Sequence, residues 1–302
     1  MLRNTRKKIE YKLTSMYFCT EMRIRRLKAE LTRSKEYNLI KENTKYKNIH
    51  KGKRCFIIGN GPSLKYVNFE HLKDEITFTV NQSPRINDFA KLHTNYHIWT
   101  DERFFEEDFT SPEGKELLEV MKSVNTKDNK PIVFYKTTAR RMILQTHLDE
   151  ILNISYVMEG FSLKTPSLFL PINRAVTGFP TCVQYLVLIA VYMGFSEIYL
   201  LGCDCTSILT TLRARLETSE KMEYMYECTP NEIKRIKKQR DKTPVEKELI
   251  WNADLFYKYR LLAEYCKLHG ARLFNATQGG LLEGIERVAL EKILKGTSKN
   301  TV

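Results

Sequence analysis

Arg54-Cys-Phe-Ile-Ile-Gly-Asn-Gly-Pro-Ser-Leu64 is the stretch that decides the fold. Its apolar part, residues 55–58, is short and rich in β-branched side chains, which predicts a buried parallel strand. A glycine turn follows, and we expect Ser63 to cap a helix over residues 64–73. Glycines let the backbone approach an anion, and a helix start offers free N–H groups. We therefore interpret Gly59, Asn60, Gly61 and Ser63 as a phosphate site; the alternative is an ordinary turn between strand and helix.

The composition is that of a globular chain, long enough for one large α/β domain or two small ones. Of 302 residues, 42% are hydrophobic and 28% charged. The longest apolar run, residues 183–193, is shorter than the roughly 18 residues that a membrane span needs, so we expect a buried helix there. The basic N-terminus has no apolar segment of the secretory type behind it. Seven scattered cysteines, with Cys203 and Cys205 too close for a zinc knuckle, predict a reduced cytoplasmic protein without a metal site.

The first 50 residues differ from the rest in charge. They carry 14 Lys and Arg against 5 Glu, so 14 − 5 = +9 of the total of +13 lies there. Apolar residues recur at helical spacing, which predicts a basic amphipathic extension over residues 1–50 and a catalytic domain over residues 51–302. The helix suits an anionic membrane surface, or a coiled coil with a second copy or another partner. We expect no nucleic acid, because no groove-reading motif accompanies the charge. The apolar positions are Ile9, Leu13, Met16, Ile24, Leu27 and Leu31.

Beyond residue 54, apolar strand-like runs alternate with helical stretches. This alternation predicts an α/β fold: a Rossmann-like, mostly parallel sheet with helices on both faces. The expected helices cover residues 113–123, 180–193 and 246–269. The expected strands cover residues 55–58, 76–80, 96–99, 132–135, 198–201 and 272–274.

Polar side chains stand where these strands end. In parallel sheets ligands gather at the carboxyl ends of the strands, so together these side chains suit the ribose, base and phosphates of a nucleotide. Each taken singly has a plainer interpretation, as a residue that caps a turn or satisfies backbone N–H groups. A second glycine turn, 176–181, precedes the helix over 180–193. The polar residues at these positions are Asn81, Gln82, Asp101, Glu102, Thr177, Gly178, Asp204 and Thr206.

Residues 207–244 form a Lys-, Arg- and Glu-rich stretch between two core elements. It is long for a passive loop. We predict a partly helical lid that closes over the substrate; the alternative is a helical insert with no such role.

In order and spacing, four segments resemble the bacterial lipooligosaccharide sialyltransferases of glycosyltransferase family 42. They look equally like the broader set that contains flagellin-modifying Maf glycosyltransferases and archaeal 6-hydroxymethylpterin pyrophosphokinases. The likeness extends over residues 54–290. The segments are Phe56-Ile-Ile-Gly-Asn-Gly-Pro-Ser-Leu64, Val80-Asn81-Gln82, Thr177-Gly178 and Gly194-Phe-Ser-Glu-Ile-Tyr-Leu-Leu-Gly-Cys-Asp204.

The resemblance implies a single Rossmann-like sheet with a lid, and a CMP-activated sugar as donor without a required metal. Asn60, Gly61 and Ser63 would then approach the donor phosphate and ribose, and Asn81 the cytidine or phosphate side. Thr177 and Gly178 would hold the sugar carboxylate or donor phosphate.

The chain departs from that pattern at the general base. The sialyltransferases use a histidine near the end of the lid, and no histidine occurs here between His147 and His269. Their tyrosine just after the Gly-x-Asp element is Thr206 in this chain. Asp101 is our first candidate for the base and Glu102 the second, because both follow a strand beside the expected donor site.

We thus expect an inverting glycosyltransferase that moves a sugar, sialic acid-like or other, to a surface-glycan or lipid-linked acceptor in lipopolysaccharide assembly. It would work in the cytoplasm, at the inner face of the cytoplasmic membrane where residues 1–50 bind it. One alternative is an ATP- and Mg²⁺-dependent pyrophosphokinase of the 6-hydroxymethylpterin type, with Asp101, Glu102 and Asp204 as metal ligands. Another is a non-enzymatic protein that binds membrane or RNA through its basic N-terminus.

Overall fold

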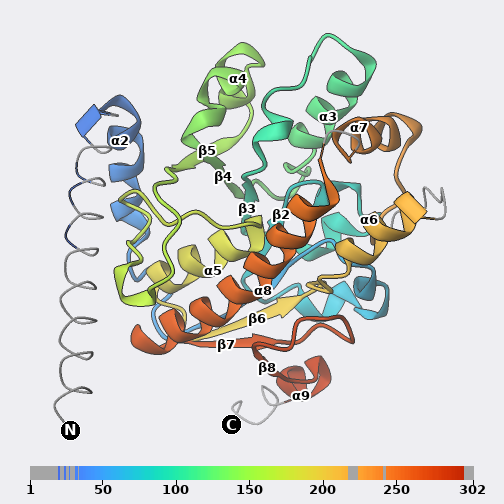
Figure 1. Ribbon diagram of the computed structural model, residues 1–302. Coiled ribbons are helices and arrows are strands. Elements are labelled where there is room, and N and C mark those ends of the chain that lie inside the picture. Colours follow the sequence, from blue (N-terminus) through green and yellow to red (C-terminus); the bar gives the residue numbers. More distant parts are fainter. Residues whose placement is uncertain are drawn as a thin grey trace, which may run out of the picture.

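An eight-stranded sheet organises the chain (Figure 1), and every neighbouring pair of strands is parallel. The computed structural model describes residues 20, 24, 27, 31–32, 34–216, 224–240 and 243–295. The strands lie in the order β5-β4-β3-β2-β1-β6-β7-β8. The predicted α/β, Rossmann-like arrangement is confirmed. The strands are β1 Arg54–Ile58, β2 Thr77–Val80, β3 Tyr96–Trp99, β4 Ile132–Lys136, β5 Asn153–Val157, β6 Glu197–Leu201, β7 Arg272–Asn275 and β8 Glu286–Arg287.

The central strand β1 is apolar on both faces because helices cover both. Cys55 and Ile57 point to one core, and Phe56 and Ile58 to the other. All four are fully buried. This continuous apolar run is typical of a parallel strand with a layer on each side, and it is what made β1 visible in the sequence.

The first layer consists of α5 (Cys182–Met193) and α8 (Val245–Leu268), which run side by side across one face of the sheet (Figure 1). The other face is covered by α3 (Pro112–Lys122) and α4 (Arg140–Gln145) over β3 and β4, and by α9 (Leu290–Lys295) near β1 and β7. The predictions for α3, α5 and α8 are confirmed to within about two residues at each end, the usual uncertainty of helix boundaries.

Short 3-10 helices make up much of the second face. They are η2 Pro62–Tyr66, η3 Phe69–Leu72, η4 Ser83–Arg85, η5 Phe89–Leu92, η6 Glu102–Phe104, η7 Thr137–Ala139 and η8 Leu148–Glu150. A further 3-10 helix, η9 Pro166–Leu168, packs against α8 on the first face.

The helix that we predicted over residues 64–73 is wrong. The segment forms η2 and η3, separated by Val67 and Asn68 in extended conformation. Asn68 accepts the backbone N–H of Glu70 on its own side chain, a local bond that starts a new turn and so competes with a continuous helix. The cap of η2 is Gly61, and Ser63 lies inside the turn.

Two strands escaped the sequence analysis, and both are at edges of the sheet. β5 reads Asn-Ile-Ser-Tyr-Val and is only partly buried, so it lacks the apolar run that marks the central strands. β8 has two residues, too few for any periodicity.

The packed domain begins before residue 51. Helix α2 (Ser34–Lys41) continues into η1 (Glu42–Tyr46), and both pack beside β5. Ile40 is fully buried, and Asn43 donates to the carbonyl oxygens of Tyr156 and Ile172 at 2.7 and 2.8 Å. The Tyr46 hydroxyl lies 2.6 Å from that of Ser155. Most of the amphipathic helix predicted over residues 1–50 lies outside the described residues; Ile24, Leu27 and Leu31, which are described, are exposed.

In the stretch predicted as a lid, the described residues form α6 (Ser207–Leu216) and α7 (Pro230–Arg240). The chain before α7 is docked on the sheet: the backbone N–H of Met225 donates to the Asn60 carbonyl oxygen at 3.1 Å. Tyr224 and Tyr226 stack with ring centroids 5.1 Å apart, and Tyr226 enters the second core. Within the part of the chain that the structure covers, no helix combines the length and apolar character that crossing a bilayer requires.

Candidate functional site

The strand order reverses between β1 and β6, which lie side by side at the middle of the sheet. In open parallel sheets a crevice for ligands forms outside the carboxyl ends at such a reversal. The predicted residues Gly59 and Gly61 follow β1, and Gly202 follows β6. The two turns touch: the N–H of Gly59 donates to the Leu201 carbonyl oxygen at 2.8 Å, and that of Gly61 to the Gly202 carbonyl oxygen at 2.9 Å. The first glycine turn of the sequence therefore lies at the topological switch point.

The anion position that we predicted at Ser63 is filled by the protein itself. The carboxylate of Asp204 accepts the Ser63 hydroxyl at 2.8 Å and the Ser63 backbone N–H at 3.2 Å, and both residues are buried. Since η2 is a single 3-10 turn, it offers no α-helix start at this point. Ser63 and Asp204 therefore belong to one buried contact, while Thr206 begins α6 by accepting the N–H of Leu209 at 2.9 Å.

The asparagines after β1 and β2 differ: Asn60 links two strand ends, whereas Asn81 has an unused acceptor. Asn60 bridges two strand ends: its amide donates to the Val80 carbonyl oxygen at 3.2 Å, and its Oδ1 accepts the Ser83 hydroxyl at 2.7 Å. Asn81 has a φ of +42°, a left-handed conformation that asparagine tolerates better than most residues. Its Oδ1 is buried and has no hydrogen-bond partner among the described residues. A strained backbone and an unused acceptor together are typical of a ligand contact.

The two predicted bases after β3 differ in how far their carboxylates are already hydrogen-bonded. Both carboxylate oxygens of Asp101 are taken by the Arg103 guanidinium, at 2.8 and 2.6 Å, and Oδ1 also accepts the Arg103 backbone N–H. Glu102 is half exposed, and its nearest partners are the Thr138 hydroxyl at 3.3 Å and the Lys136 ammonium at 3.6 Å. The geometry therefore favours Glu102 over Asp101 as a group that can receive a proton.

A hollow of about 390 Å³ lies against Glu102, beyond the carboxyl ends of β3 and β4. It is lined by acidic and apolar side chains together with one guanidinium: Glu102, Phe105, Glu106, Glu107, Thr138, Arg141, Met142 and Gln145.

The second glycine turn leads into α5, a full α-helix with its start at the carboxyl edge of the sheet. Thr177 is fully buried, and its hydroxyl oxygen accepts the N–H of Leu163 at 2.7 Å. Gly178 leaves room for Glu159, whose Oε1 would lie 2.8 Å from an added Cβ. Burial raises the pKa of Cys182, the first residue of α5, to about 12, and the charge of Asp101 adds to the shift. The start of α5 therefore lies near the end of β3.

Lys136, Glu159 and Tyr185 form a cluster that the sequence analysis missed. The Lys136 ammonium lies 2.6 Å from a Glu159 carboxylate oxygen, and the Tyr185 hydroxyl donates to the same oxygen. Burial, followed by the charge of Glu159, raises the pKa of Tyr185 well above its ordinary value, so the phenol stays protonated. Lys136 directly follows the strand predicted over residues 132–135 and could have been noticed there, whereas Glu159 follows β5, which the pattern did not show. Lys136 lies near both Glu102 and Glu159, and Glu159 lies against Gly178. Glu102 and the turn at Gly178 therefore belong to one site.

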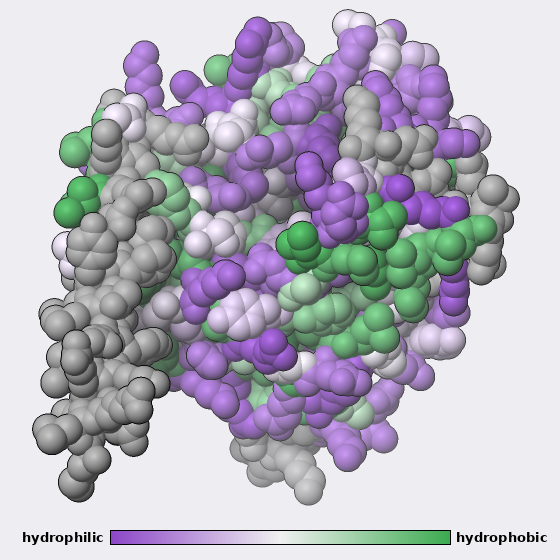
Figure 2. Space-filling model, in the orientation of Figure 1, coloured by the Kyte–Doolittle hydropathy of each residue, from purple (hydrophilic) through white to green (hydrophobic). Residues whose placement is uncertain are grey.

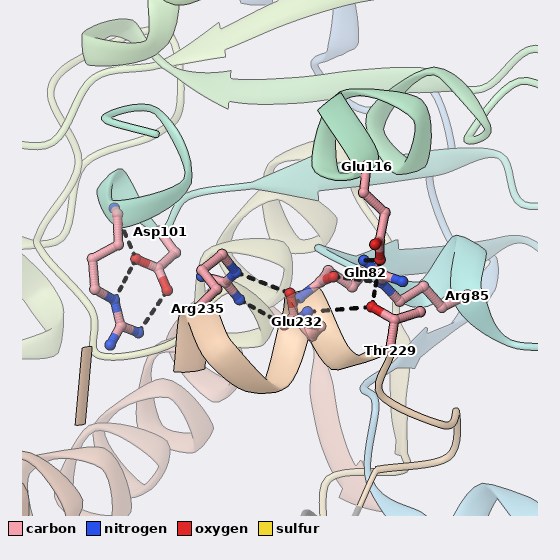
Figure 3. Close-up of polar contacts among 8 residues, drawn as sticks. Gln82, Arg85, Asp101, Glu116, Thr229, Glu232 and Arg235 are labelled. Atoms are coloured by element: carbon pink, nitrogen blue, oxygen red, sulfur yellow. Dashed lines mark hydrogen bonds and ion pairs between the residues drawn. The ribbon is translucent and has the colours of Figure 1, made fainter. Parts of the chain in front are cut away.

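Helix α7 covers the carboxyl end of β2 with charged side chains (Figure 3). Gln82 donates through Nε2 to Glu232 at 2.5 Å, and its Oε1 accepts Nε of Arg85 at 2.6 Å. Glu232 also pairs with Arg235, and Arg85 with Glu116 of α3. Gln82, predicted as a donor-binding residue, is thus occupied by a side chain of the predicted lid.

These residues make one continuous edge from β6 through β1, β2 and β3 to β4. Among the described residues, no three side chains of the metal-ligating kinds gather as an ion would need. No family model matches the chain, and a search of curated proteins gives no significant match.

Proposed function

We propose that the protein is a glycosyltransferase that moves a sugar from a nucleotide donor, CMP-linked, to a surface-glycan or lipid-linked acceptor, with inversion and without a required metal. The observation that carries this proposal is the position of the first glycine turn. It lies at the switch point between β1 and β6, where parallel α/β sheets bind nucleotides, and the start of α5 stands at the same edge.

Polar groups of this edge support a position for the donor. The nucleoside would lie over the ends of β1 and β2, within reach of the buried Oδ1 of Asn81. The carboxylate of a sialic acid-like sugar would approach the start of α5 and Lys136, because backbone N–H groups, a helix dipole and an ammonium all favour an anion. The phosphate would lie beside the nucleoside at the end of β2, where hydrogen-bond donors stabilise it as it leaves with the electron pair of the bond to the sugar.

The hollow beside Glu102 supports a position for the acceptor. An acceptor hydroxyl there would attack the anomeric carbon from the side opposite the phosphate, which inverts the configuration. Glu102 takes the hydroxyl proton as the new C–O bond forms and the bond to the phosphate breaks. Lys136, 3.6 Å from Glu102 and 2.6 Å from Glu159, positions both carboxylates.

We place the protein in the cytoplasm, where nucleotide-activated sugars are available, and at the inner face of the cytoplasmic membrane through the basic residues 1–33. The acidic hollow itself does not favour an anionic acceptor group, so a neutral sugar hydroxyl is the acceptor that the site suits.

A nucleotide screen by thermal shift tests the proposal. A ligand at one hundred times its Kd stabilises a folded chain by about 2.7 kcal/mol, which raises Tm by several degrees. We expect CMP to do so without Mg²⁺, and cytidine to do so less. A shift with Mg-ATP alone would instead support the pyrophosphokinase alternative.

The rate of sugar transfer provides a second test of the same proposal. With a CMP-sugar that binds, Glu102→Gln should reduce transfer by about 10²-fold or more and leave the thermal shift by CMP unchanged. Glu106→Gln, at another carboxylate of the same hollow, is the matched control and should keep most of the activity. Equal losses in the two variants would remove Glu102 as the base.

A further inference from the structure

The carboxylate of Glu232 occupies a site built from three donors. It accepts Gln82 Nε2 at 2.5 Å, Arg235 Nη2 at 2.6 Å and Arg235 Nε at 2.9 Å. Its side chain is 2% exposed. Two of these donors belong to a guanidinium, which binds carboxylates and phosphates with the same paired geometry. A pocket that holds a carboxylate in this way also fits one face of a phosphate.

Arg235 has donors that Glu232 does not use. The residue is 6% exposed, its guanidinium lies 4.5 Å over the ring of Phe104, and its Nη1 is buried without a hydrogen-bond partner among the described residues. An unsatisfied buried donor costs about 1–3 kcal/mol, so such groups call for an explanation. The non-bridging oxygens of a phosphate, three in a monoester and two in a diester, could accept the bonds that Glu232 now accepts and also bond Nη1.

The position of this site coincides with the donor edge. Gln82 directly follows Asn81 at the end of β2, and Figure 3 shows Arg235 between Glu232 and the Asp101 side of the edge. The start of α7 is held separately, because Thr229 and Asn231 donate to Glu116 of α3 at 2.6 and 2.9 Å. Glu232 can therefore leave the site while the beginning of α7 stays attached.

We propose that Gln82 and Arg235 form a binding site for the phosphate of the nucleotide, and that Glu232 fills this site in the free protein. Phosphate and carboxylate compete for the same donors, so nucleotide binding releases the Glu232 side chain while Arg235 and α7 stay in place. The inference rests on the proposed function in naming a nucleotide, whereas the anion site itself does not depend on the sugar.

Calorimetry on the full chain tests the exchange, with CMP, cytidine and inorganic pyrophosphate as probes. Glu232→Gln removes the competing charge and keeps the shape of the side chain, so CMP and pyrophosphate should bind about tenfold more tightly. Arg235→Gln should weaken both by about tenfold or more. Neither change should alter the affinity for cytidine, which has no phosphate.

Glu113→Gln is the matched control. Glu113 of α3 pairs with Lys234 of α7, so this variant removes one carboxylate contact of the same helix away from Arg235. Its affinity for CMP should equal that of the wild type. If Glu113→Gln tightens binding as much as Glu232→Gln, the effect comes from loosening α7 and the inference is wrong.

The outcomes separate the two proposals. CMP binding that Glu232→Gln leaves unchanged overturns the anion exchange and keeps the transferase. Pyrophosphate binding that tightens in Glu232→Gln while CMP does not bind keeps the anion site and overturns the CMP donor. No binding of either probe by any variant overturns both.

Discussion

At the scale of residues, the glycines of the first turn are explained by a neighbouring loop. Gly61 has φ −70° and ψ 153°, which any residue can adopt, so its backbone does not require glycine. A Cβ atom at this position would overlap the carboxylate of Asp204 and lie 2.6 Å from the Gly202 carbonyl oxygen. The glycines predict a close approach of the backbone to a phosphate. The structure shows instead a close approach of this turn to the loop after β6.

This packing predicts the effect of Gly61→Ala. The methyl group has no space without moving Asp204 off Ser63, so we expect a loss of about 2–3 kcal/mol in the free energy of unfolding. Chemical denaturation followed by circular dichroism measures it.

Gly160→Ala serves as the control for that variant. An added Cβ there would lie 3.4 Å from the Ala175 Cβ and the Val176 carbonyl oxygen, close to ordinary contact. Its stability should stay within about 1 kcal/mol of the wild type. Equal losses in the two variants would show that the turn tolerates a side chain at residue 61.

At the scale of elements, the N-terminal segment has two parts that the charge pattern did not separate. The basic composition runs through residue 50, yet the contacts with β5 begin in α2, at the buried Ile40. Asn43 and Tyr46 then tie η1 to the body through hydrogen bonds. The boundary is therefore set by burial and not by charge.

Two truncations measure this boundary. Removal of residues 1–33 should leave Tm within a few degrees of the full chain, because every contact described above is retained. Removal of residues 1–50 takes away Ile40, Asn43 and Tyr46 and should cost several kcal/mol, since deleting one large buried apolar side chain alone costs about 2–5 kcal/mol.

Binding to vesicles that contain anionic lipid provides the second measurement on these truncations. The chain without residues 1–33 should lose most of the binding if the basic segment is the anchor. If instead it unfolds like the longer truncation, the element boundary drawn here is wrong.

At the scale of the whole molecule, a buried polar group couples folding to pH. His97 lies inside β3, fully buried, with Nδ1 2.8 Å from the Thr79 hydroxyl. Burial lowers its pKa from 6.5 to about 3. Below pH 6.5 the unfolded chain therefore binds a proton at His97 that the folded chain does not bind. The folded chain is fully stable in this respect above pH 6.5, and its free energy of unfolding falls progressively as the pH falls toward 3.

We expect His97 to account for on the order of 2 kcal/mol of lost stability between pH 7 and pH 5. In His97→Gln the free energy of unfolding should fall correspondingly less over this range, although it starts lower at pH 7 because packing is lost. An unchanged slope in His97→Gln contradicts the assignment.

The sequence by itself determined the fold class, because strands such as β1 are buried on both faces and helices such as α5 are apolar throughout, and both signals are local. It also located Gly59, Gly61 and the turn before α5, since glycine next to an apolar run marks a turn. Only the tertiary structure decided what approaches: Asp204 meets Ser63, Glu232 meets Gln82, and Lys136 joins Glu102 to Glu159. These partners lie from about twenty to 150 residues apart along the chain. No local pattern specifies such pairs, because the strand order and the packing of α7 are set by burial summed over the whole sheet.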